Sequence, residues 1–196
     1  LTTPTLKEEE KIGEEFVTLS GKNSLKELRE MSAEEIFEVE CRLTEALFES
    51  GRGLMLVPNV DGYVLDKTVK QIWRDVEMKD IPYMCGAVTD DLGAKPEDVK
   101  EDKPGILLEE CKRWANVREK AGMPAYLYHF ARRLPGDDWG AFHSSELWYT
   151  FGTLGRCWRP MTEHDYELSE EMMTCWTNFM KTGNPNGDGQ RLEENW

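Results

Sequence analysis

Two short apolar segments, residues 81–88 and 125–131, constrain the fold of this chain more than any other feature. The first is a continuous apolar run of strand length, which is typical of a strand that is buried on both faces. The second is rich in the aromatic residues that favour strands. A helical pattern over residues 107–121 lies between them. Because strands that alternate with helices form sheets with helices packed on them, the pattern predicts an α/β fold.

Helical periodicity is also strong before the first strand. Residues 6–20 have the pattern of an amphipathic helix with an acidic outer face. Ser24 and Ser32 each begin a capping box, in which a Ser and a Glu three residues later satisfy each other's backbone N–H groups. After Ser32, apolar residues recur at helical spacing until Gly51 ends the run. These residues are Ile36, Val39, Leu43 and Leu47.

The remaining local signals predict turns and short helices. A hairpin or turn is expected around Asp61, and an exposed loop over residues 95–104. Residues 146–151 predict a short helix. We expect a last helix to be capped by Ser169 and to end at Gly183, since glycine readily adopts the left-handed conformation that closes a helix.

Composition limits the class of partner. The 196 residues suffice for one hydrophobic core, and a hydrophobic content of 39% argues against an intrinsically disordered polypeptide. The net charge of −14 argues against binding to nucleic acid or to anionic membranes, because their phosphates attract Lys and Arg. No apolar stretch approaches the roughly 20 residues of a membrane-spanning helix. We therefore expect neither nucleic acid nor a membrane as a partner.

The five cysteines give no sign of a disulfide framework. Their number is odd, their spacing is irregular, and no Cys-x-x-Cys occurs. We expect them to be reduced and packed as small apolar groups, which favours a cytoplasmic location and leaves secretion open. The cysteines are Cys41, Cys85, Cys111, Cys157 and Cys175.

An acid followed by a histidine is the main chemical signal in the chain. The first apolar strand ends in Asp90 and Asp91, and His143 follows the second strand after a loop. Functional groups of α/β proteins gather beyond the carboxyl ends of strands. A carboxylate that holds an imidazole in one tautomer makes it a general base, so the order acid-then-histidine predicts two-thirds of a nucleophile–His–acid triad. The competing interpretation is a structural histidine and a solvated Asp-Asp turn.

Five segments, in order, closely resemble the C-terminal part of type B carboxylesterases, the cholinesterase and para-nitrobenzyl esterase group. They are PNVDG at 58–62, PYMCG at 82–86, YLYxF at 126–130, GxxHxxEL at 140–147 and NFxKTGNPN at 178–186. Together they cover nearly the whole chain. The resemblance implies that residues 1–196 are a single piece, the C-terminal portion of an α/β-hydrolase domain with helices packed on a few central-sheet strands.

The resemblance also assigns roles to the acid and the histidine. It implies that His143 is the catalytic histidine and that Asp91 stands where many members carry Glu. Because Asp is one methylene shorter, its strand end must approach the imidazole more closely. Asp90 is the rival for this role, although its side chain should point elsewhere along an extended segment. Glu146 matches an acidic position behind the histidine, where we expect a buried, hydrogen-bonded support.

The surroundings of His143 supply further candidates. Trp139 and Phe142 flank the histidine and are candidates for the wall of a substrate pocket. Ser144 and Ser145 are poor nucleophiles, because the glycines of a nucleophile elbow do not flank them. Residues 184–189 imitate the start of a calcium loop, but Asn195 stands where a bidentate Glu is required, so we expect a polar turn. The resemblance implies neither a metal nor an organic cofactor.

The nucleophile is the missing third of the triad. No Gly-x-Ser-x-Gly occurs in the 196 residues, whereas family members carry this elbow and a glycine-rich oxyanion loop in their N-terminal half. We therefore expect a serine carboxylesterase acting on small carboxylic esters, in which a companion polypeptide carries the N-terminal half with the serine, and this chain alone is inactive. The alternative is a non-catalytic, cholinesterase-like binding or adhesion module.

Overall fold

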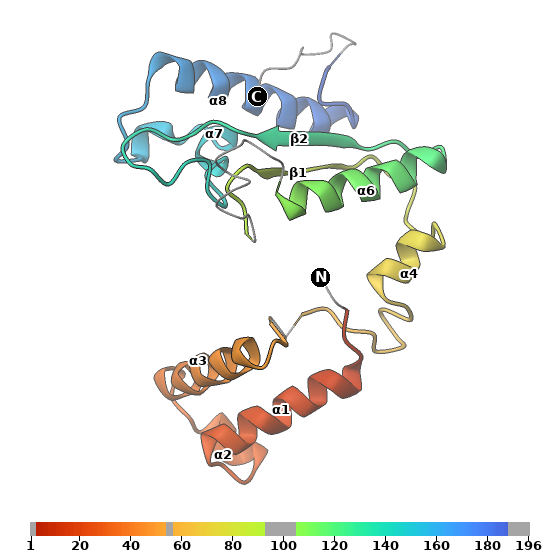
Figure 1. Cartoon of the computed structure of the whole chain (residues 1–196), viewed down its shortest axis with the longest axis vertical. Helices are drawn as coiled ribbons and strands as arrows, with labels where there is room; N and C mark the ends of the chain where they lie inside the picture. The colour runs from red at the N-terminus through yellow and green to blue at the C-terminus, as the bar shows by residue number, and fades with distance from the viewer. Residues whose placement is uncertain (1–2, 54–56, 93–104, 188–196) are drawn as a thin grey trace. The chain divides into compact units, whose positions relative to one another are not determined.

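The structure is a computed structural model that describes residues 3–53, 57–92 and 105–187 (Figure 1). The chain divides into two compact units, Leu1–Asp75 and Val76–Trp196. Whether they form the single piece expected from the sequence stays a prediction. The loop expected over residues 95–104 lies outside the described residues.

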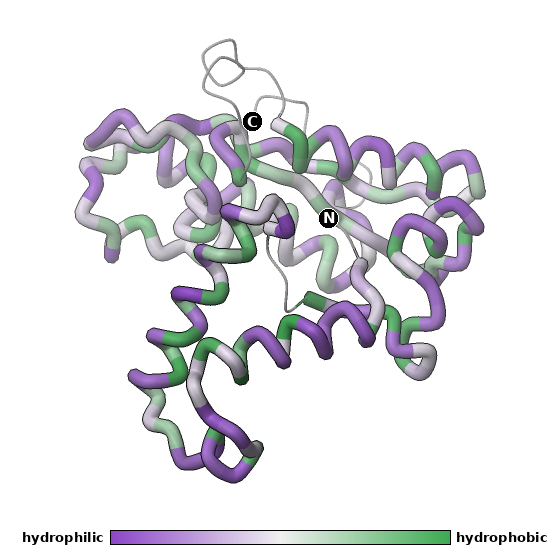
Figure 2. Tube along the Cα trace, turned by 60° about the horizontal axis from the view of Figure 1, so that its bottom comes forward, coloured by the Kyte–Doolittle hydropathy of each residue, from purple (hydrophilic) through white to green (hydrophobic). Residues whose placement is uncertain are grey.

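The first unit is helical. Its core is formed where α1 and α3 pack against each other through Ile12, Leu43 and Leu47, with Phe16 and Leu19 beside them. Hydrophilic and hydrophobic residues alternate along these helices, as expected for helices with one buried face (Figure 2). The helices are α1 (Leu6–Ser20), α2 (Leu25–Arg29), α3 (Ala33–Glu49) and α4 (Val69–Arg74).

The predicted starts of these helices are largely confirmed. Ser32 and Glu35 form the expected capping box at the start of α3. At α2, Ser24 caps the backbone N–H of Glu27, but the Glu27 carboxylate accepts from the N–H of Asn23 instead of from Ser24. Of the apolar positions predicted for α3, Val39, Leu43 and Leu47 are buried, whereas Ile36 is largely exposed. The helix ends at Glu49, just before Gly51.

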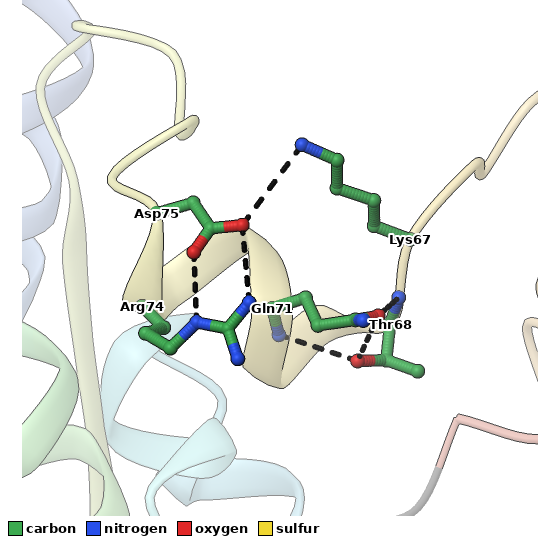
Figure 3. Close-up of polar contacts among 5 residues, drawn as sticks. All are labelled: Lys67, Thr68, Gln71, Arg74 and Asp75. Atoms are coloured by element: carbon green, nitrogen blue, oxygen red, sulfur yellow. Dashed lines mark hydrogen bonds and ion pairs between the residues drawn. The ribbon is translucent and has the colours of Figure 1, made fainter.

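Helix α4 was not predicted, because its apolar pattern is too short to show a period. Its start is a capping box formed by Thr68 and Gln71 (Figure 3). Asp75 follows its last residue; the Asp75 carboxylate accepts from the Arg74 guanidinium and lies 3.9 Å from Lys67 Nζ.

The turn predicted from the sequence is confirmed at Asp61, whose Oδ1 accepts three consecutive backbone N–H groups. These belong to Tyr63, Val64 and Leu65.

The second unit contains a parallel strand pair. Strand β1 (Met84–Val88) runs beside β2 (Tyr126–Phe130), and α6 (Ile106–Lys120) crosses between them and packs on both (Figure 1). The register pairs Met84 with Tyr126 and Val88 with Phe130, so both strands end at the same edge. This is the α/β arrangement that the sequence predicts.

Helices after β2 cover the aromatic side of that strand. Tyr126 and Tyr128 contact Phe179 and Trp176 of α8, at ring-centroid distances of 6.2 and 4.9 Å. The main core lies at the carboxyl ends of the strands, where Val88 and Phe130 are buried. The elements of this region are α7 (Leu147–Thr150), the short 3-10 helix η1 (Leu154–Arg156) and α8 (Glu163–Thr182).

The first strand is shorter and more exposed than predicted. Pairing starts only at Tyr83, whose carbonyl accepts from the N–H of Tyr126, because Pro82 has no N–H to donate to a ladder. Ile81 is 49% exposed, and within β1 only Ala87 and Val88 are buried. The expectation of a strand buried on both faces over residues 81–88 is therefore wrong for its first half.

The last helix starts earlier than predicted. Its N-cap is Thr162, and the Asp165 carboxylate accepts from the N–H and the hydroxyl of this Thr. Ser169, the expected cap, lies inside α8, where its buried hydroxyl donates to the carbonyl of Tyr149 at 2.8 Å. The predicted end at Gly183 is confirmed, with φ at 76°.

All five cysteines are free thiols, as expected. Cys41 is exposed, which corrects the expectation that all of them pack as apolar groups; the other four are partly or fully buried. Burial, with the neighbouring Cys111, raises the pKa of Cys85 to about 12.

Across the part of the chain that the structure describes, no helix is both long and apolar enough to cross a membrane.

Candidate active site

The site is built at the carboxyl end of β1. Beyond Val88 the chain turns so that the Asp91 carboxylate folds back on the strand, accepting from the N–H of Val88 at 3.1 Å and of Leu92 at 2.8 Å. These two bonds fix the carboxylate next to its own backbone. The Asp91 side chain is only 8% exposed, so its charge lies where solvent screens it weakly.

Asp91 and His143 are in direct contact. Asp91 Oδ1 lies 2.6 Å from His143 Nδ1, although 52 residues separate them in the sequence. With its proton on Nδ1 donated to the carboxylate, the neutral ring presents Nε2 as the proton acceptor. The His143 side chain is 54% exposed, so a reacting group can approach the ring. The arrangement can perform general acid–base chemistry.

Asp90 has a different partner from its neighbour. Its Oδ2 accepts from the N–H of Ala141 at 2.6 Å, and its own N–H donates to the carbonyl of Ala141 at 2.9 Å. Asp90 therefore binds the loop backbone, while Asp91 binds the imidazole of His143. The Asp90 carboxylate is therefore not the one that holds the ring.

Glu146 lies close to this pair. Burial raises the pKa of Glu146, and the Asp91 carboxylate adds to the shift. Its Oε2 is buried and has no hydrogen-bond partner among the described residues, so the hydrogen bond expected for a support is not seen at this oxygen. Ser144 has a positive φ of 70°, and Ser145 is fully buried. Glu146 is thus near enough to interact with the charges of Asp91 and His143, its supporting role stays a prediction, and Ser145 is inaccessible to a substrate.

The aromatic residues beside His143 form a chain of edge-to-face contacts. Trp139 is 69% exposed, and its ring centroid lies 6.0 Å from that of Phe142, which in turn lies 5.9 Å from Trp148. Phe142 packs against the main core, whereas Trp139 stands out from it. The two rings differ in how freely they can contact a ligand, and their place in a substrate pocket stays a prediction.

An arginine anchors the loop that leads to His143, and the sequence analysis missed it. The Arg159 guanidinium donates to both Asp137 oxygens, at 2.8 and 2.6 Å, and to the carbonyl of Pro135 at 2.9 Å. It also lies over the Phe142 ring at 5.3 Å. No local pattern links Arg159 to Asp137, because 22 residues separate them.

His129 and the segment that resembles a calcium loop contact other residues of the protein. His129 Nε2 lies 3.0 Å from Thr89 Oγ1, and burial with the nearby Lys112 lowers the pKa of this histidine. The segment that begins at residue 184 and resembles the start of a calcium loop is a turn, in which Asn184 Oδ1 accepts from the N–H of Asn186. Residues 188 and 189 of that motif lie outside the described part. Within the described ranges, no group of three or more His, Cys, Asp or Glu side chains could hold a metal ion.

The fold matches solved esterases. A structure titled a thermophilic PNB esterase aligns with 100% of this chain and 49% of its own, with a TM-score of 0.68 and 21% sequence identity. The Geobacillus stearothermophilus carboxylesterase Est55 aligns with 97% of this chain and 48% of its own, with a TM-score of 0.67 and 20% identity. The fold is therefore that of the α/β-hydrolase esterases, and the chain spans about half the length of these structures.

Sequence comparison finds similarity to carboxylesterases and their relatives over part of the chain. The sequence model of the carboxylesterase family matches residues 105–196. Carboxylesterase 4A of Bos taurus is 37% identical over 78 residues, which are 37% of this chain and 14% of the relative. Acetylcholinesterase 1 of Caenorhabditis elegans is 34% identical over 89 residues (42% and 14%), and human Neuroligin-3 is 30% identical over 146 residues (66% and 16%). The resemblance to the carboxylesterases is confirmed, and residues 105–196 match the carboxylesterase-family model.

Proposed function

We propose that this chain is part of a serine carboxylesterase and supplies the acid and the histidine of its triad. The observation that carries the proposal is the 2.6 Å contact between Asp91 Oδ1 and His143 Nδ1 at the carboxyl end of a parallel strand. The match of residues 105–196 to the carboxylesterase-family model supports the reaction class. A fold alone would not, because the same fold serves many functions.

The reaction divides into acylation and deacylation. A serine from outside these 196 residues attacks the ester carbonyl, while His143 Nε2 takes the hydroxyl proton. His143 then gives that proton to the departing alcohol oxygen as the carbon–oxygen bond breaks. In the second half, His143 deprotonates a water molecule that attacks the acyl-enzyme, and it returns the proton to the serine. Asp91 holds the ring in place and stabilises the imidazolium in both halves.

The remaining site residues take supporting roles in this proposal. Glu146 adds a partly buried acid behind the histidine, and its raised pKa favours the protonated form more than in an ordinary Glu. Trp139 and Phe142 offer apolar surface beside the ring for a small carboxylic ester. The companion polypeptide supplies the serine and the oxyanion donors, so this chain alone is expected to be inactive.

The test is ester hydrolysis by the assembled protein, prepared by co-expressing this chain with a polypeptide that carries the serine. With para-nitrophenyl acetate as the probe, His143→Ala should lower kcat/KM by about 10⁴-fold or more, because the serine loses its base. His164→Ala is the matched control, since this histidine is exposed on α8 and should leave the rate unchanged. Activity of His143→Ala within tenfold of the unmodified protein would refute the assignment.

A non-catalytic binding module is the second candidate. It is favoured by the match to Neuroligin-3, which covers 66% of this chain, more than the carboxylesterase 4A match does. The same assay separates the two functions. If the assembled protein shows no ester hydrolysis that depends on His143, the binding module becomes the better account.

A further inference from the structure

Asp90 makes a two-point connection to the loop that carries His143. Its backbone N–H donates to the carbonyl of Ala141, and its side-chain Oδ2 accepts from the N–H of the same residue at 2.6 Å. Ala141 is fully buried and lies two residues before His143. Asp90 therefore binds both the backbone N–H and the backbone carbonyl of Ala141.

The residue before Ala141 is adapted to this connection. Gly140 has φ at 70°, a conformation that residues with a side chain rarely adopt. A Cβ atom at this position would collide with Asp90 Oδ2. The carbonyl of Gly140 accepts from the N–H of Leu134, which closes the loop on itself. Glycine at position 140 thus lets the backbone approach the Asp90 carboxylate.

The connection sets the register between the two segments. Asp90 and Phe142 form an isolated parallel bridge, so the chain just beyond β1 pairs with the segment that leads to His143 and no longer with β2. A slip of one residue would shift the loop by about 3.3 Å and turn its side chains to the other side. His143 would then lose its 2.6 Å contact with Asp91. The two adjacent carboxylates therefore have different partners: Asp90 binds the backbone of Ala141, and Asp91 binds the imidazole ring of His143.

We propose that Asp90 is a positioning residue, which sets His143 opposite Asp91 by holding Ala141. The proposal rests on the proposed function for its effect on the rate. Its structural content, the dependence of the Asp91–His143 contact on Asp90, stands on the geometry alone. Asp90 does not touch the imidazole and takes no part in proton transfer.

The test compares Asp90→Ala and Asp90→Asn in the assembled protein. Asp90→Ala removes the acceptor for the Ala141 N–H, so kcat for para-nitrophenyl acetate should fall by about a hundredfold, as small misplacements of a catalytic group do, with KM nearly unchanged. Asp90→Asn keeps an acceptor oxygen and should recover most of the lost rate. Asp61→Ala is the matched control, because Asp61 also accepts backbone N–H groups but lies in the first unit.

A spectroscopic readout separates positioning from a general loss of stability. The proton between His143 Nδ1 and Asp91 should give a downfield proton resonance in wild type, Asp90→Asn and Asp61→Ala, and should be shifted or lost in folded Asp90→Ala. If Asp90→Ala does not fold, Asp90→Leu takes its place, since leucine has nearly the shape of aspartate but offers no acceptor for the Ala141 N–H. Loss of the resonance and of kcat in that variant supports the proposal.

Different results would contradict the positioning role of Asp90 and the proposed esterase function. If ester hydrolysis depends on His143 but Asp90→Ala, or Asp90→Leu in its place, keeps kcat within about threefold and retains the resonance, Asp90 is not a positioning residue. If no hydrolysis depends on His143, the esterase proposal fails. The resonance then decides alone: its loss in Asp90→Ala supports positioning, and its retention overturns it.

Discussion

At the scale of single residues, Asp90 and Asp91 show how neighbours of one type acquire different roles. The order of acid and histidine along the chain predicted a carboxylate partner for His143, and the family resemblance favoured Asp91 over Asp90 for that role. The partner of Asp90 could not be predicted, because it is a backbone N–H, which any residue at position 141 except proline would offer. The same holds for Arg159, whose contacts with Asp137 and Pro135 depend on how a loop closes in space.

Replacement of Asp91 tests the residue scale. Asp91→Asn keeps the size of the side chain but cannot stabilise the imidazolium, and its amide can select the wrong tautomer of His143. We expect kcat to fall by about 10⁴-fold with little change in KM. The measurement is steady-state hydrolysis of para-nitrophenyl acetate by the assembled protein. Asp61→Asn serves as the control, and an Asp91→Asn rate equal to that control would remove Asp91 from the triad.

At the scale of elements, helices with a long apolar stripe and a capping residue could be predicted closely. The starts and ends of α1 and α6 lie within one residue of the expected ones. The start of α8 was wrong, because Ser169 resembles a cap but its hydroxyl binds the carbonyl of Tyr149, a contact between two helices. The strand predicted over residues 81–88 was longer than β1, which begins at Met84. The burial of a strand depends on the elements that pack on it, and these cannot be read from the apolar run itself.

Asp165 joins three elements in the second unit. It accepts from the Arg132 guanidinium after β2 at 2.7 Å, from the Tyr149 hydroxyl of α7 at 2.7 Å, and from Thr162 at the start of α8. Its side chain is fully buried. Burial alone would raise the pKa of Asp165, but the hydrogen bonds from Arg132, Tyr149 and Thr162 outweigh it and hold the pKa far below its ordinary value.

This pKa gives a prediction for stability against pH. Because the folded-state pKa of Asp165 is lowered, its stabilisation is complete above the unfolded pKa of about 3.9 and is lost as the pH falls towards the folded value. Asp165→Asn should lower the free energy of unfolding at pH 7 by about 3–5 kcal/mol, since Arg132 loses its charge partner. Between pH 5 and 3, the variant's stability should fall less steeply than that of wild type.

Urea unfolding followed by tryptophan fluorescence measures both effects. Asp137→Asn is the comparison, because Arg159 also lowers the pKa of Asp137 but 28% of this side chain is accessible to solvent, so both effects should be smaller than in Asp165→Asn. Equal pH slopes for wild type and Asp165→Asn would show that this carboxylate does not control acid stability.

At the scale of the whole molecule, the fold class could be predicted because local periods and a family resemblance agreed. Alternating helices and strands predict α/β, and the solved esterases share this fold over the full length of the chain. The same comparison shows that the chain spans about half of those structures. The division into two compact units was not predicted, since no obvious linker separates them in the sequence.

The central claim is that Asp91 and His143 activate a serine from outside residues 1–196. A fluorophosphonate, which reacts with the activated serine of esterases, tests it when the labelled peptide of the assembled protein is identified by mass spectrometry. We predict one labelled serine outside these 196 residues in wild type, and loss of nearly all labelling in His143→Ala. Labelling of Ser144 or Ser145, or equal labelling in wild type and His143→Ala, would contradict the account.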